Sequence, residues 1–526
     1  MNKLLGKRIY KILSWGVIAF FAALYVSLIF NNNLLTDEAF TMQLISGSVP
    51  EIISGTAHDV HPPLYYLFAK AVYTVFGRGI PPQKVLALIP MVLCLVLGPT
   101  VAAKQYGEKA GFWYTLFLAC VPCTMEFALQ VRMYSMCVLF ITGAFLWSDR
   151  IIRKERAADA AAGNVGSSGP SGGSAHASFG DWSVYVLWML AAAYTHYFAL
   201  VAAGFIQLAL GWRMKKLKPW LLSSIAMIIG YLPWGWILLR QTLLVTESYW
   251  IPPITPEVVY GYFLWAFGLE NNPMTAPIFI MLLAALWFAP KRAAVSVTAD
   301  FEAETDENAP VADGAGTGDA VMDDGGAATA RTALLIPILV LFFGVGFSLL
   351  TRPIFRDQYL FPCMGLVALY FGIGMQALMG FGEISPSPAF RDPVAIAVTV
   401  IVGAFLLYVG AIQYKECFHQ EYRSTLVPEL EAYFAANLNP GDCIVYNFEV
   451  FDFIYEYYFP ENDLIYIEDY DPENDYQITY FLDTPYNREF TYEQLVEWGY
   501  TMAYCGHMGV EQNEFEVYKM WKTEKQ

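Results

Sequence analysis

The stretch ILSWGVIAFFAALYVSLIF (residues 12–30) decides the fold, because no charged residue interrupts it. A helix of about 20 apolar residues is long enough to cross the hydrocarbon core of a bilayer. Further runs of similar length and few charges follow it, at residues 84–103, 110–128, 133–149, 219–239, 274–290, 333–351, 358–378 and 393–412. The sequence therefore predicts a helical membrane protein with many spans.

The overall composition supports a membrane protein. Of the 526 residues, 56% are hydrophobic, whereas soluble domains are usually about 45–50% apolar. The first apolar run has no small-residue cleavage motif, so we expect an uncleaved anchor. The net charge of −17 comes largely from the stretch 300–324 and from the tail after residue 416. Because nucleic-acid surfaces need clustered Lys and Arg, this acidic balance argues against a nucleic-acid partner.

Positive charges near the ends of the apolar runs predict the orientation, because they favour the cytoplasmic side. Lys3, Lys7, Arg8 and Lys11 precede the first run, which places the N-terminus in the cytoplasm. Residues 31–83 then form one long outer loop, with a short helix at 62–76 on the outer face. Residues 182–212 form two short helices that meet outside. This arrangement gives about 11 spans and a C-terminus outside the cytoplasm.

Two low-complexity inserts and a polar tail complete the predicted organisation. Residues 157–180 and 293–330 are rich in Gly and Ala and have little to bury, so we expect disordered cytoplasmic loops within a membrane domain at 1–415. Residues 416–526 alternate between helical and strand patterns, which predicts a small extracytoplasmic α/β domain. The patterns are helical at 425–438 and 491–500, and strand-like at 442–447, 463–468, 501–506 and 513–522. In such a compartment, Cys443 and Cys505 are able to form a disulfide.

Ionisable and polar residues gather on the predicted outer side. Ionisable groups at the membrane edge are costly, and they are therefore functional candidates. Arginines on the outer side also run against the positive-inside tendency. The clusters are Asp37 and Glu38 after the first span; His58, Asp59 and His61 in the outer loop; Gln130, Arg132 and Tyr134 in LQVRMYS; His196 and Tyr197 in YTHYF; and Arg352, Arg356, Asp357 and Tyr359 in TRPIFRDQYLF.

Structural alternatives exist for each cluster. TDEA is a plausible helix start with Thr36 or Asp37 as the N-cap. His196 also suits a packed interface position, and Arg132 and Arg356 suit snorkelling side chains at span ends. The convergence of the clusters on one face favours a functional site. A carboxylate can accept a proton from an acceptor group, and an arginine can hold a phosphate through two hydrogen bonds. No phosphate-binding or dinucleotide-binding glycine motif is present.

The order TDEAFT, HPPLYY, RMYS, THYF and FRDQYLF resembles that of bacterial family 39 glycosyltransferases. These enzymes belong to the C-type (GT-C) superfamily and are related to protein O-mannosyltransferases and to the lipid A aminoarabinose transferase. The resemblance covers roughly residues 1–415. One departure is Gln130, which stands where such proteins often have Glu before the RMY arginine.

The resemblance implies transfer, with inversion, of a sugar from a polyprenyl-phosphate donor to a lipid, glycan or protein acceptor at the cell envelope. Asp37 would be the general base, and Glu38 would orient it or the acceptor. Arg356 and Arg132 would bind the donor phosphate. The substrate pockets would be lined by His58, Asp59, His61, Tyr134, His196, Tyr197 and Tyr359. The family implies no required cofactor, although His58, Asp59 and His61 are also suitable ligands for a divalent metal.

Two other classes of protein remain as alternatives. A lipid or polysaccharide flippase also uses ionisable residues in the membrane, but transporters usually place them mid-span and show inverted repeats. No internal repeat is evident here. A membrane anchor that presents the C-terminal domain as a binding module leaves the outer clusters unexplained. A plasma-membrane glycosyltransferase is therefore the favoured prediction.

Overall fold

The computed structural model describes residues 2–30, 34–163, 176–244, 251, 253–268, 274–287, 324–384, 388–418, 428–448, 452–471, 476–484, 490–509 and 514–522. The chain divides into two compact units built from discontinuous segments. The first comprises Met1–Ser27, Ile53–Tyr65 and Val85–Tyr414, and the second comprises Leu28–Ile52, Tyr66–Lys84 and Lys415–Gln526. Most of the low-complexity inserts predicted at 157–180 and 293–330 lies outside the described residues.

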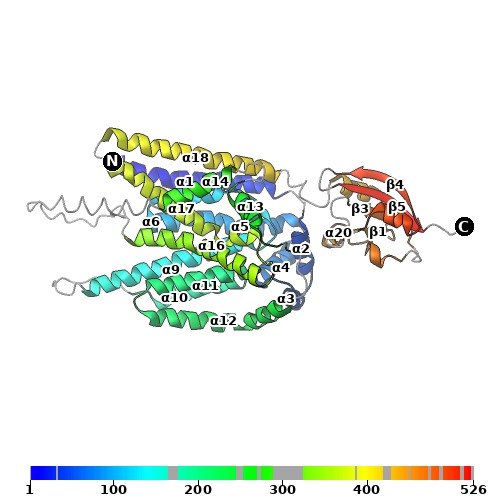
Figure 1. The fold of residues 1–526 in the computed structure, drawn as a ribbon, viewed down its shortest axis with the longest axis horizontal. Helices are drawn as coiled ribbons and strands as arrows, with labels where there is room; N and C mark the ends of the chain where they lie inside the picture. Colours follow the sequence, from blue (N-terminus) through cyan, green and yellow to red (C-terminus); the bar gives the residue numbers. More distant parts are fainter. Residues whose placement is uncertain are drawn as a thin grey trace, which may run out of the picture. The chain divides into compact units, whose positions relative to one another are not determined.

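Most of the described chain before residue 419 is helical (Figure 1). In chain order, the helices are α1 (Asn2–Leu28), α2 (Thr36–Ser46), α3 (Val49–His58), α4 (Leu64–Phe76), α5 (Ile80–Leu97), the π-helix η1 (Gly98–Ala102), α6 (Ala103–Tyr106), α7 (Glu108–Cys120), α8 (Pro122–Leu129), α9 (Tyr134–Gly163), α10 (Phe179–Ala193), α11 (Tyr197–Arg213), α12 (Leu217–Leu244), α13 (Pro256–Phe267), α14 (Thr275–Leu286), α16 (Asp324–Leu350), the 3-10 helix η2 (Asp357–Cys363), α17 (Met364–Ile384) and α18 (Pro388–Phe418).

Six stretches of helix in the described residues are long and apolar enough to cross a membrane. They are Ile9–Leu28, Ile80–Tyr106, Tyr134–Asp159, Leu217–Thr242, Gly326–Leu350 and Asp357–Met379. A seventh is obtained if α7 and α8, which meet at an angle of 69°, form one broken span. The bend has a local cause, because Val121 adopts an extended conformation and Pro122 cannot donate a helical hydrogen bond.

Other predicted apolar segments, the short outer helix at 62–76 among them, correspond to shorter apolar helices. These are Leu64–Phe76, Phe179–Ala193, Tyr197–Arg213, Thr275–Ala284 and Val400–Ile412. The short outer helix predicted at 62–76 and the pair predicted at 182–212 are thus helical as expected. The many-span helical architecture is confirmed, and the count of about 11 stays a prediction.

Close helix packing in the first unit depends on small residues. Helices α7 and α17 pack side by side, and a Cβ added to Gly372 would lie only 2.4 Å from the carbonyl oxygen of Ala110. Small residues let membrane helices approach closely and so increase their van der Waals contact. This contact matters because the hydrophobic effect does not drive helices together in lipid. The buried rings of Trp113 and Phe117 on α7 pack against Phe371 on α17, beside Gly372.

A buried polar cluster joins four helices of the same unit. The carboxylate of Asp149 on α9 accepts hydrogen bonds from Arg153 Nε at 2.7 Å and Arg213 Nη2 at 3.1 Å. It also accepts from the hydroxyls of Tyr106, at 3.0 Å, and Thr329. Because a buried carboxylate is costly unless it is paired and hydrogen-bonded, this cluster fixes where α6, α11 and α16 meet α9.

The C-terminal part of the second unit contains a five-stranded mixed sheet in the order β2-β1-β3-β5-β4. Figure 1 draws its strands as orange and red arrows. Strand β1 pairs in parallel with β2 and β3, whereas β5 is antiparallel to β3 and β4. The core between sheet and helices includes Val445, Phe481 and Leu495. The elements are α19 (Pro428–Asn437), β1 (Cys443–Tyr446), α20 (Asp452–Tyr458), β2 (Asp463–Tyr466), the 3-10 helix η5 (Ile467–Asp469), β3 (Thr479–Asp483), α21 (Tyr492–Glu497), β4 (Tyr500–Met508) and β5 (Phe515–Lys522).

Every element predicted in this tail is present, although the strand predicted at 463–468 ends at Tyr466 and is followed by η5. Two observed elements, β3 and α20, have no counterpart in the predictions. Strand β3 is buried along its whole length, so it lacks the alternation that marks a half-exposed strand. Helix α20 has the sequence DFIYEYY, which is rich in aromatic residues typical of strands. Tertiary packing therefore decides the conformation of both segments.

The disulfide suggested between Cys443 and Cys505 is not formed, because both thiols are free. Cys443 lies on β1 and Cys505 lies on β4, with β3 and β5 between them. Strands are spaced about 4.8 Å apart, so this separation exceeds the Cα distance of about 7 Å that a disulfide tolerates.

Candidate functional site

The acidic pair after the first span lies in the first turn of α2. Glu38 is 4% exposed, and its carboxylate accepts a hydrogen bond from the backbone N–H of Leu35 at 2.7 Å. Leu35, rather than Thr36 or Asp37, is thus the N-cap residue. Glu38 therefore caps the start of the helix, whereas the side chain of Asp37 is exposed. Both carboxylates are favoured there by the positive end of the helix dipole.

A lysine that the sequence analysis did not select lies near this pair. Lys84 is 2% exposed, and its ammonium group is close enough to Glu38 for their charges to attract. A buried cation needs such a partner. Its sequence signal was its position as the first residue of the apolar run 84–103, at the end predicted to face outward.

In the first unit, the structure brings together predicted residues from four separate segments. The Nδ1 atom of His61 lies 3.0 Å from Asp59 Oδ2, and its Nε2 atom lies 3.4 Å from Arg132 Nη2. The ring of His196 packs near this pair, and its centroid is 5.6 Å from that of His61 and 5.1 Å from that of Tyr359. The centroid of Tyr134 is 5.9 Å from that of His196. We call this group the histidine cluster.

The environment of the cluster sets the charges of two members. Burial by itself raises the pKa of Asp59, but the hydrogen bond to His61 and the charge of Arg132 outweigh it and hold the pKa below its usual range. Burial, with the neighbouring His61 and Arg132, lowers the pKa of His196 well below the ordinary value. His196 is therefore neutral at pH 7. Its Nδ1 accepts from the backbone N–H of Phe198 at 3.1 Å, which leaves the proton on Nε2.

Tyr197 and the segment from Thr56 to Asp59 are held by a glutamine that the sequence patterns did not indicate. Gln241 on α12 accepts a hydrogen bond from the Tyr197 hydroxyl. Its amide donates to the carbonyl oxygen of Thr56 at 3.0 Å, and also to that of Asp59. The only sequence signal was an uncharged polar residue near the end of an apolar helix. His58 does not join the cluster, since it is exposed and its Nδ1 lies 2.7 Å from Ser54 O.

A cavity of about 540 Å³ opens beside the histidine cluster. Its lining includes the polar side chains of His61, His196 and Arg352, together with the apolar side chains of Phe343 and Phe347. Tyr197, Gln241 and Tyr359 also line it. The cavity therefore offers a cationic group, hydrogen-bonding groups and apolar surface to a ligand that has both polar and apolar parts.

The two arginines predicted to bind a phosphate do not line this cavity. Arg132 is buried against His61. Arg356 forms an ion pair with Asp357, with 3.7 Å between Nε and Oδ1. The arginine in the wall is Arg352, from the same segment TRPIFRDQYLF. Gln130, beside Arg132, has a buried side-chain oxygen that accepts no hydrogen bond from the described residues.

A metal site at His58, Asp59 and His61 is not formed in the described part of the chain, where no three His, Cys, Asp or Glu side chains group as ligands. His58 points to the backbone of its own helix, as described above. The side chains of Asp59 and His61 are instead paired with each other.

The arrangement of helices and sheet resembles a solved membrane protein. The apo structure of ArnT from Cupriavidus metallidurans superposes with a TM-score of 0.55 at 13% sequence identity, covering 96% of this chain and 98% of that chain. The structure of the same ArnT bound to undecaprenyl phosphate gives a TM-score of 0.54 at 12% identity, with the same coverage. No protein-family model matches the sequence, and no curated protein is significantly similar to it. The chain is thus a polytopic membrane protein with the fold of ArnT.

Proposed function

We propose that this chain is a membrane glycosyltransferase that transfers a sugar from a polyprenyl-phosphate donor to an acceptor outside the cytoplasm. The observation that carries the proposal is the cavity beside the histidine cluster, because its lining contains groups suited to both parts of such a donor. The aromatic and aliphatic lining residues suit an isoprenoid chain, and Arg352 suits a phosphate. Arginine holds phosphate through charge-assisted hydrogen bonds, which are stronger than neutral ones.

Two further observations support this function. The fold matches that of ArnT, and one of the ArnT structures is bound to undecaprenyl phosphate. The order of the sequence motifs also resembles that of family 39 glycosyltransferases. In this function, the donor would contact His61, Tyr134, His196, Tyr197 and Tyr359, with Asp59 keeping His61 oriented.

The proposed reaction is a single displacement. Asp37 accepts the proton of the acceptor hydroxyl or amine while the acceptor atom bonds to the anomeric carbon. The bond from that carbon to the phosphate oxygen breaks at the same time, and polyprenyl phosphate leaves with the electron pair. Attack opposite the leaving group inverts the anomeric configuration. Glu38 supports Asp37 by capping the helix on which both residues lie.

The predicted topology belongs to the same proposal. With the N-terminus in the cytoplasm, the histidine cluster and residues 416–526 lie on the extracytoplasmic side of the plasma membrane. The donor sugar and the acceptor then meet outside the cell interior. Labelling of a cysteine introduced near residue 55 from the outside only is the expected result, and labelling from the cytoplasm would reverse the assignment.

The base assignment is tested by Asp37→Asn, which keeps the shape of the side chain but cannot accept the proton. We expect sugar transfer and release of polyprenyl phosphate to fall by about 10²–10⁴-fold, the usual contribution of a general base. Expression and membrane insertion should stay normal because Asp37 is exposed. The matched control is Glu51→Gln, an exposed acid of the same loop, which should retain activity. Full activity of Asp37→Asn would refute the assignment.

A further inference from the structure

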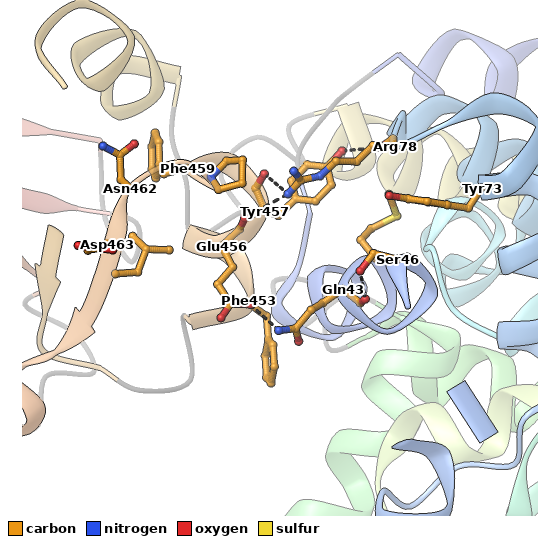
Figure 2. Close-up of a pocket in the computed structure, with 13 residues that line it drawn as sticks. Gln43, Ser46, Tyr73, Arg78, Phe453, Glu456, Tyr457, Phe459, Asn462 and Asp463 are labelled. Carbon is orange, nitrogen blue, oxygen red and sulfur yellow. Dashed lines mark hydrogen bonds between the residues drawn. The ribbon is translucent and has the colours of Figure 1, made fainter. Parts of the chain in front are cut away.

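A second cavity, of about 440 Å³, lies within the unit that contains the C-terminal sheet (Figure 2). One wall comes from α2 and α4, which supply Gln43, Ser46 and Tyr73. The opposite wall comes from α20 and the segment that enters β2, including Asn462 and Asp463. The proposed transfer reaction does not use any of these residues.

The walls of this cavity are held together by direct contacts. Arg78 Nη2 donates to the carbonyl oxygens of Glu456 at 3.1 Å and Tyr457 at 2.6 Å, in the last turn of α20. Its guanidinium lies 4.7 Å from the centroid of the Tyr457 ring, and the Tyr457 hydroxyl donates back to Arg78 O at 2.9 Å. A cation at a helix C-terminus is favoured by the helix dipole. The cavity is therefore preformed rather than assembled by a ligand.

The chemistry of the lining fits a ligand with many hydroxyl groups. Carboxylates accept from hydroxyls, carboxamides both donate and accept, and aromatic faces cover the apolar C–H surface of a sugar ring. The cavity combines these three kinds of group in Asp463, Asn462 and Phe453. Among the described residues, no side chain or backbone group donates a hydrogen bond to the carboxylate of Asp463. That carboxylate is therefore available to a ligand.

The charge of the lining excludes an anionic ligand. Glu456 and Asp463 each contribute a carboxylate, while the one lining cation, Arg78, is engaged by the end of α20. Burial, and after it the nearby charge of Asp452, raise the pKa of Glu456, and an added anion would disfavour its charged form further. A phosphate or carboxylate group placed here would be repelled.

The cavity lies along the helix that carries the proposed base. Asp37, Phe40 and Gln43 are spaced three residues apart on α2, and such residues form one ridge of a helix. Six residues correspond to a rise of about 9 Å. The ring of Phe40 also packs on that of Phe453, with 5.3 Å between centroids, which continues the cavity wall toward the start of α2. A ligand of two or three sugar rings covers that distance.

We propose that this cavity is an acceptor subsite for a saccharide that is uncharged or carries amino groups. The proposal deepens the proposed function and rests on it, because it names the class of acceptor for the same reaction. It excludes acceptors whose bound portion carries phosphate or carboxylate groups.

Binding to the full-length protein in detergent tests the subsite without any donor. The probes for calorimetric titration are maltotriose and triacetylchitotriose as uncharged saccharides, triglucosamine as the amino-bearing one and trigalacturonate as the anionic one. We expect at least one of the first three to bind, and trigalacturonate to bind at least about tenfold more weakly. Asp463→Asn should weaken binding about tenfold, because it removes a charge-assisted hydrogen bond. Ser46→Trp should abolish binding by filling the cavity.

The matched control is Asp469→Asn, an exposed aspartate of the same unit that does not line the cavity, and it should bind like the unmodified protein. The proposal is overturned if no probe binds, if trigalacturonate binds best, or if Asp463→Asn and Ser46→Trp both bind normally. Sugar transfer to a lipid or peptide without saccharide binding would refute the saccharide subsite and support the glycosyltransferase function. Saccharide binding with no release of polyprenyl phosphate from a donor would refute the glycosyltransferase function and retain the saccharide site.

Discussion

Arg352 and Arg356 show how finely residue roles depend on the backbone path. Both occur in TRPIFRDQYLF, and the sequence offers no means to choose between them. Between the end of α16 and the start of η2 the chain is irregular, so no helical period relates the two side chains. Arg352 enters the cavity wall, while Arg356 pairs with Asp357.

The residue-scale prediction concerns these two arginines. Arg352→Gln should weaken binding of undecaprenyl phosphate by about 10–100-fold, because a hydrogen-bonded charge contributes about 1.5–3 kcal/mol. Arg356→Gln, four residues away, should change binding less than threefold. Binding to the purified protein is measured with tritiated undecaprenyl phosphate. If only Arg356→Gln loses binding, phosphate binding would instead be assigned to Arg356, as the family resemblance implies.

At the scale of elements, the long apolar helices and most of the short elements of the tail were predictable, whereas β3 and α20 were not. The predicted runs recur as helices because hydropathy acts locally on each segment. Strand β3 and helix α20 were not predicted because residues distant in sequence determine which of their side chains are buried. The polar contacts that align the helices were also not predictable, because in the sequence Asp149 is one charged residue at the end of an apolar run.

The element-scale prediction is that Asp149 organises α9 with its neighbours. Asp149→Ala leaves Arg213, whose side chain is 9% exposed, without its buried counter-charge. Breaking a buried pair in this way typically costs about 3–5 kcal/mol. The thermal unfolding midpoint of the detergent-solubilised protein should therefore fall by several degrees. Asp159→Ala on the same helix removes only the more exposed pair with Lys216 and should change the midpoint little. Equal midpoints for the two variants would contradict the role of Asp149.

At the scale of the whole molecule, the compact units do not follow the sequence. The second unit combines Leu28–Ile52 and Tyr66–Lys84 with the C-terminal sheet, although these segments are distant in sequence. Composition marks where the polar tail begins near residue 416, but it carries no information on which distant segment that tail contacts. The pairing instead depends on particular contacts, such as those of Arg78 with α20.

The whole-molecule prediction is that Arg78 holds α20 in the second unit. Arg78→Ala removes two hydrogen bonds and a cation–π contact, so amide hydrogen exchange in residues 452–458 should accelerate by about tenfold or more. Lys70→Ala is the matched control, because Lys70 donates to Ser46 O within the loop and not to α20. Exchange rates in α20 that are the same in both variants would show that other contacts suffice.

The sequence by itself determined that this chain is a many-span helical membrane protein with a small α/β tail and polar clusters beside its apolar runs. Hydropathy and charge act over one span at a time, and one span is a continuous stretch of sequence. Only the tertiary structure decided that Glu38 caps a helix, that Arg352 lines the cavity and that Gln241 holds the loop. It also placed Asp463 and Gln43 around one cavity. These relations join atoms from distant segments, and a local pattern cannot encode them.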